Sequence, residues 1–167
     1  MATFSLHEVE DWTENASCTP TALAALTGRP LQEIGELLAE IAAENGRAIG
    51  PELRADYAPQ DWAGAVNRLG GDWVVAEEFR DREFSDRPSI NEWMETHLGV
   101  EPELVVCYGA NNIGHVFATF EGDVVDTYTE GKRVHFTGVP IDFEFLKVAY
   151  TLLVEPLVDS QSAVSTA

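Results

Sequence analysis

The chain has 167 residues, a length that suits a single domain with a substantial hydrophobic core. Its 29 acidic residues outnumber its 10 basic residues, so the formal net charge is −19, and 45% of the residues are hydrophobic. This charge argues against direct binding to nucleic acid or to an anionic membrane, because both need clustered lysine and arginine. The hydrophobic content argues against a wholly disordered acidic chain.

Four helices are expected in the first hundred residues, over 19–27, 31–44, 61–69 and 90–98. In the first of these, Thr19 is the expected N-cap, Pro20 occupies the favoured first helical position and Gly28 ends the helix. Ser89 and Glu92 have the spacing of a capping box and begin the last helix. Between the third and fourth helices we expect a short strand over 73–76 and a charged surface loop over 77–87.

After residue 100 the hydrophobic pattern changes from helical to extended. The segments with the extended pattern are 104–108, 116–120, 124–128, 133–136 and 148–154. A tight turn at Glu121-Gly122 or Gly122-Asp123 joins the second and third of them into a hairpin. Helices followed by antiparallel strands predict an α+β fold, with a helical N-terminal half packed on a C-terminal antiparallel β-sheet. We expect one domain over 1–156 and a polar tail over 157–167.

The two cysteines lie in different surroundings. Cys107 lies in an apolar, strand-like run, where a cysteine is usually a small core residue. Cys18 lies in a polar segment just before a helix, and a helix N-terminus stabilises the thiolate and offers free amides to an oxyanion. Asn15, three residues upstream, is a candidate oxyanion donor, and Trp12 is a candidate wall of a cleft. No spacing of cysteine or histidine suggests a metal site, and we expect no cofactor.

A histidine and an aspartate in the predicted hairpin can complete a site around Cys18. If the turn is at Glu121-Gly122, His115 lies opposite Tyr128 and Asp126 is its diagonal neighbour on the same face, with Cβ atoms about 7–8 Å apart. Aspartate in that place would orient the imidazole, which would accept the thiol proton. The structural alternative is a half-buried cysteine in a helix cap, a hydrogen-bonded core histidine and a surface aspartate.

Three short motifs resemble the small papain-like cysteine peptidases of bacteriophages and bacteria, a group allied to the bacteriocin-processing peptidases. The first is Cys18 followed by Ala22-Leu23-Ala24 and Thr27-Gly28. The second is Gly114-His115-Val116-Phe117-Ala118, and the third is Val125-Asp126-Thr127. Together they reach from about residue 12 to residue 130, in the family's order of Cys, His and Asp. Papain-like enzymes usually place a glutamine several residues before the nucleophile, where this chain has Trp12.

The resemblance implies a papain-like fold in which Cys18 is the nucleophile, His115 the general base and Asp126 the orienting acid. The expected activity is that of a phage-encoded cysteine peptidase or thiol hydrolase that cleaves a peptide or isopeptide bond. The expected partner is a peptide or protein substrate, biased by the acidic surface toward basic groups. The first residues lack the features of a secretory signal, so we expect the host-cell cytoplasm or a virion as the location.

Two alternatives from other functional classes remain open at this point. The fold could serve, without catalysis, as a structural or decorating component of a virion. An acidic inhibitor that binds a basic partner surface is a further alternative.

Overall fold

The computed structural model describes residues 5–47, 58–96, 101–110, 114–138 and 146–154. Its helices are α1 (Cys18–Thr27), α2 (Leu31–Glu44), α3 (Pro59–Arg68) and α4 (Ile90–Thr96), with 3-10 turns η1 (Phe84–Asp86) and η2 (Phe136–Gly138). Its strands are β1 (Trp73–Glu78), β2 (Glu103–Gly109), β3 (Gly114–Phe120), β4 (Asp123–Val125), β5 (Val134–His135) and β6 (Leu146–Val154). None of the helices described is long and apolar enough to cross a membrane.

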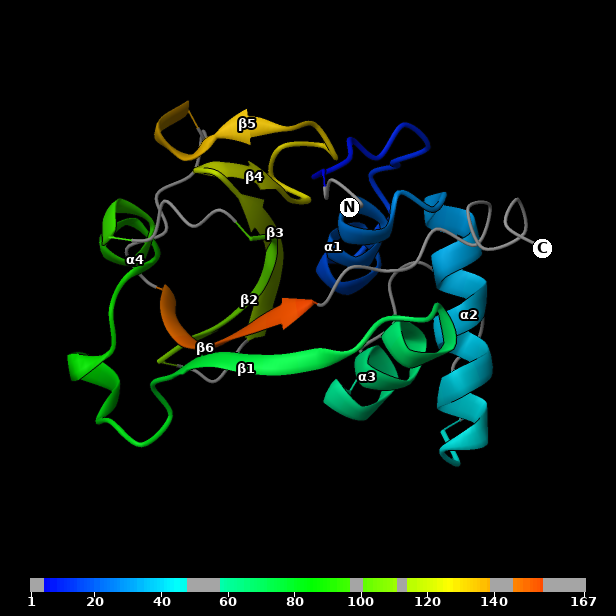
Figure 1. Cartoon of the computed structure of the whole chain (residues 1–167), viewed down its shortest axis with the longest axis horizontal. Coiled ribbons are helices and arrows are strands. Elements are labelled where there is room, and N and C mark those ends of the chain that lie inside the picture. Colours follow the sequence, from blue (N-terminus) through cyan, green and yellow to red (C-terminus); the bar gives the residue numbers. More distant parts are fainter. Residues whose placement is uncertain (1–4, 48–57, 97–100, 111–113, 139–145, 155–167) are drawn as a thin grey trace.

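The strands form one six-stranded sheet in the order β1-β6-β2-β3-β4-β5, and all the described pairs are antiparallel. Helices α1 to α3 lie on one side of the sheet and α4 on the other (Figure 1). Alternate residues of β3 face the two sides: Val116 and Ala118 pack with the core of α1 to α3, whereas Phe117 packs with Trp93 of α4. The predicted α+β class, with helices mainly before strands, is confirmed.

Helix α2 has the bounds that its apolar stripe predicts, but α1 begins one residue earlier than expected. Ser17 is the N-cap, so Cys18 is itself the first helical residue and the prediction of Thr19 as cap is wrong. The helix ends as predicted at Gly28, which has φ of 72° and donates its N–H to the carbonyl of Ala24. Gly28 is favoured there because a side chain is strained at a positive φ.

Two predicted elements of the sheet have different lengths in the structure. Strand β1 continues to Glu78 and is followed by Phe79, which is buried, so the charged surface loop begins later than expected. Strand β4 ends at Val125 rather than at residue 128, because the chain turns at Asp126, whose carbonyl accepts the N–H groups of Thr129 and Gly131. The predicted helix stop at Gly99 and the polar tail over 157–167 lie outside the described residues.

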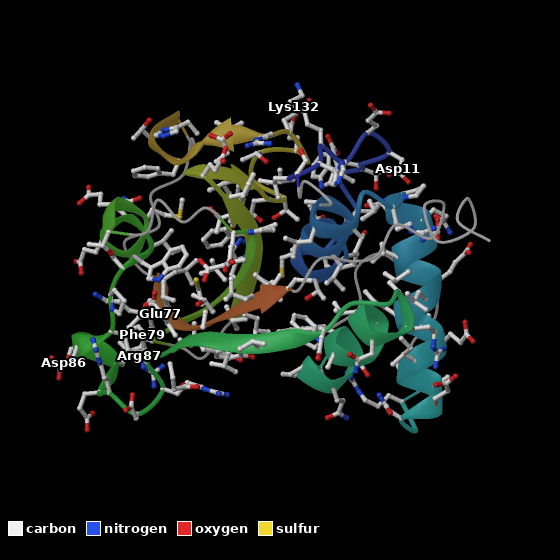
Figure 2. All side chains as sticks on the ribbon, in the orientation of Figure 1. Asp11, Glu77, Phe79, Asp86, Arg87 and Lys132 are labelled. Atoms are coloured by element: carbon white, nitrogen blue, oxygen red, sulfur yellow. The ribbon has the colours of Figure 1, made fainter. Side chains whose placement is uncertain are left out.

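Residues 5–12 form an extended segment, here called the N-terminal strap, that runs beside β4 and β5 before the chain enters α1 (Figure 1). Asp11 of the strap lies at the beginning of α2 (Figure 2), where its carboxylate accepts the backbone N–H groups of Leu31 and Gln32 at 2.8 and 3.1 Å. Since the residue at the N-cap, Pro30, has no side chain that could accept them, an acid from 20 residues upstream caps this helix. The strap is thereby fixed against the helical layer.

Candidate active site

Cys18 is placed by the junction of the N-terminal segment and α1. The thiol belongs to the first residue of the helix and is partly buried. Ser17 accepts the first helical hydrogen bond, from the N–H of Thr21, so the amides of Cys18 and Thr19 precede the intrahelical ladder. Pro20 has no N–H, which leaves these two amides as the donors that the first turn can offer to a developing negative charge.

The position of the thiol relative to the sheet follows from the length of β4. The hairpin pairs Phe120 with Asp123 and Ala118 with Val125, and in this register the N–H groups of even-numbered β3 residues point toward β4. Because β4 ends at Val125, Val116 has no partner in the ladder on that side. Its amide N–H instead donates to the sulfur of Cys18. The site therefore lies at an open edge of β3, where the helical layer reaches the sheet.

His115 and Asp126 are joined as their diagonal relation in the hairpin predicts. Nε2 of His115 lies 2.7 Å from Oδ2 of Asp126, and both side chains are buried. The other carboxylate oxygen of Asp126 accepts the N–H of Thr127 at 2.6 Å, which fixes the orientation of the carboxylate. With Nε2 engaged by Asp126, Nδ1 is the ring nitrogen available for the hydrogen bond that joins His115 to Cys18. The structure thus brings Cys18, His115 and Asp126 together.

The electrostatics of the three groups favour a thiolate beside an imidazolium. Burial raises the pKa of Cys18, but the hydrogen bond to His115, the charge of His115 and the amide of Val116 lower it, and the net direction is downward. Burial lowers the pKa of His115, but the charge and hydrogen bond of Asp126, with a contribution from Cys18, raise it to about 10. A thiolate at neutral pH is the nucleophilic form of cysteine.

Cys107 provides a contrast within the same chain. It pairs with His115 across β2 and β3 and is completely buried. Burial, with smaller contributions from the charges of Asp126 and Cys18, raises its pKa well above the ordinary value. The prediction that Cys107 is a core residue and Cys18 the chemically distinctive cysteine agrees with these surroundings.

Tyr128 is a residue of the site that the sequence reasoning placed opposite His115 without giving it a role. Its ring centroid lies 5.1 Å from that of His115, although the strand pairing that predicted this proximity stops at Val125. The tyrosine is 38% exposed, so its ring lies between the imidazole and solvent. A ring in that place shields the His115–Asp126 pair from water and strengthens their attraction.

The two secondary candidates are placed less closely. Asn15 is exposed, on a turn closed by the N–H of Ala16 and the carbonyl of Thr13 at 3.0 Å. Trp12 is half-buried and packs against the larger core and against Gly131. The contacts of these two residues in the described parts of the chain do not join them to Cys18. The oxyanion role of Asn15 and the cleft-wall role of Trp12 therefore stay predictions.

Within the described parts of the chain, no group of three or more His, Cys, Asp or Glu side chains is arranged to hold a metal ion. The chain matches no model of a known protein family and no curated protein. The functional argument therefore rests on the site itself.

Proposed function

We propose that the chain is a thiol hydrolase of the papain type that cleaves a peptide or isopeptide bond through an acyl-enzyme. The observation that carries the proposal is the chain of contacts from Cys18 to His115 and from His115 to the buried carboxylate of Asp126, 2.7 Å away. A hydrogen-bonded core histidine needs no thiol at a helix N-terminus beside it, and a structural cysteine needs no imidazole.

In the proposed reaction the Cys18 thiolate attacks the carbonyl carbon of the substrate, and a carbon–sulfur bond forms while the carbonyl oxygen becomes an oxyanion. The amides of Cys18 and Thr19 at the start of α1 are placed to stabilise that oxyanion. His115 gives its proton to the leaving amine as the carbon–nitrogen bond breaks, which leaves a thioester. Water then attacks the thioester, His115 accepts a proton from the water, and the acid is released with the thiolate restored.

The test is selective alkylation followed by trapping of the acyl-enzyme. Iodoacetamide should modify Cys18 far faster than Cys107, and His115→Ala should abolish that preference. A peptide aldehyde or acyloxymethyl ketone with basic side chains should label Cys18 covalently, and mass spectrometry of the tryptic peptides would locate the adduct. Slow and equal alkylation of both cysteines would contradict the proposal and leave a noncatalytic role, such as a virion component or an inhibitor of a basic partner.

A further inference from the structure

The turn that carries Asp126 is held by the N-terminal strap. Within the turn, the Asp126 carbonyl accepts the Gly131 N–H at 3.0 Å, and the Thr129 hydroxyl bridges the Asp126 amide and the Lys132 carbonyl. The strap then joins it from outside, because the N–H of Val9 donates to the carbonyl of Gly131 at 2.8 Å. Figure 2 shows Lys132 at the margin of the sheet where the strap passes. The acid of the site is thus held by residues that precede the nucleophile in the chain.

Gly131 is the point of closest contact between the turn and the strap. Its φ is 75°, and a Cβ built there would lie 2.9 Å from the Val9 carbonyl oxygen and 2.9 Å from the Cβ of Trp12. The carbonyl oxygen belongs to the backbone, so a side chain at residue 131 could be accommodated only if the strap moved away. Any displacement would pass to Cys18, because Trp12 continues through the turn at Thr13 to Ala16 directly into α1.

Arg133 fixes the other end of the strap. Its guanidinium donates to the carbonyl of Leu6 at 3.3 Å and to the carboxylate of Asp123 at 2.7 Å, and its backbone N–H donates to Glu8 at 2.9 Å. Asp123 is the first residue of β4, so Arg133 joins the strap to the hairpin that also carries His115. Together with Gly131, it attaches the strap to the hairpin on both sides of the Asp126 turn.

We propose that the N-terminal strap belongs to the catalytic machinery, with Gly131 as the positioning residue that holds the Asp126 turn in register with Cys18. This inference rests on the proposed thiol chemistry and adds to it the element that aligns the acid with the nucleophile. Displacements of about 1 Å in an active site can reduce rates by about 100-fold. A small movement of the strap is therefore sufficient to uncouple the site without unfolding the protein.

The test compares Gly131→Ala with Gly70→Ala in the full chain. Gly70 has a similar φ of 88° but no atom within 4 Å of the position that a Cβ would take, so its substitution reproduces the backbone strain without crowding. We expect Gly131→Ala to lower the alkylation rate of Cys18 near neutral pH by about 10- to 100-fold and to move the inflection of its pH–rate profile upward. Gly70→Ala should keep the rate and the inflection of the wild type. An unchanged profile in a folded Gly131→Ala protein would overturn the proposal.

A second pair of variants decides the matter if Gly131→Ala does not fold. Arg133→Gln releases the strap without adding an atom to the turn, and Arg80→Gln removes an equal charge, with its ion pair to Glu78 and its contact with the ring of Tyr150. Only Arg133→Gln should move the pH–rate inflection upward. Equal profiles for the two would overturn the role of the strap while leaving the proposed function standing, because that depends on the selectivity of the wild-type protein for Cys18 over Cys107.

Discussion

Replacing Asp126 by asparagine would separate the charge of the acid from its hydrogen bond. Asp126 is completely buried and its charge is the largest influence that raises the pKa of His115, from 6.5 to about 10 against the lowering effect of burial. Since each pKa unit corresponds to about 1.36 kcal/mol, the raised value represents a preference of about 5 kcal/mol for the imidazolium. An opposite charge at this range typically contributes about 1–3 of those units.

Asp126→Asn should therefore lower the pKa of His115 by about 1–3 units and weaken its support for the thiolate. The charge of Asp126 also raises the pKa of Cys18 directly, but this is the smallest of the influences on that thiol. A rise of one unit in the thiol pKa reduces the thiolate fraction about tenfold below it, so alkylation of Cys18 near pH 6 should fall about tenfold or more.

The assay is the rate of iodoacetamide modification of Cys18 from about pH 5 to about pH 9, a range that brackets the ordinary pKa of histidine, with NMR titration of the His115 ring in the same samples. Asp81→Asn is the matched control, because it makes the same chemical change at an exposed position. Superimposable profiles for Asp126→Asn and wild type, with an unchanged titration of the imidazole, would refute the reasoning.

Three further predictions follow from other contacts. Because folding raises the pKa of His115, its contribution to stability is complete below pH 6.5 and is lost as the pH rises toward about 10, whereas the lowered pKa of Cys18 gives a contribution present above 9.0 and lost as the pH falls through the lowered value. Cys18→Ser should thus lose stability more steeply than wild type above neutral pH, by at most about 1.4 kcal/mol per pH unit in urea unfolding; parallel curves would contradict this. Asp11→Ala should cost about 0.5–2 kcal/mol in thermal unfolding, because it uncaps α2, and a cost equal to that of Asp81→Ala would argue against the cap. Tyr128→Ala should slow alkylation of Cys18 about 2- to 10-fold while Tyr128→Phe does not, and equal rates would exclude a role for the ring.

The hairpin shows how far local patterns determine the site. Fixing the turn at Glu121-Gly122 fixes every pairing in β3 and β4, and the observed pairing of Phe120 with Asp123 is the one this turn requires. From that register the proximity of His115 to Asp126 and Tyr128 follows by alternation alone. What alternation does not give is the end of β4 at Val125, which depends on hydrogen bonds made by Thr129 and Gly131 after the strand.

The contacts of the strap were not predictable in the same way. Asp11 has no periodic relation to Leu31, and Glu8 and Arg133 are separated by 125 residues, so no local motif connects them. Gly131 follows the same rule, since a glycine in a loop suggests a turn but does not identify the backbone that approaches it. Local physics therefore predicted which residues carry the chemistry, and long-range packing determined how they are held.

The bond between Arg133 and Glu8 also affects when the site forms during synthesis. Cys18 leaves the ribosome early, whereas His115, Asp126 and Arg133 follow only in the last third of the chain. Contacts between residues so distant in sequence form late in folding, because the intervening chain must first be ordered. Until then Cys18 has no imidazole beside it and keeps the pKa of an ordinary thiol, about 8.5. A nascent chain is thereby protected from its own nucleophile until its last strands have paired.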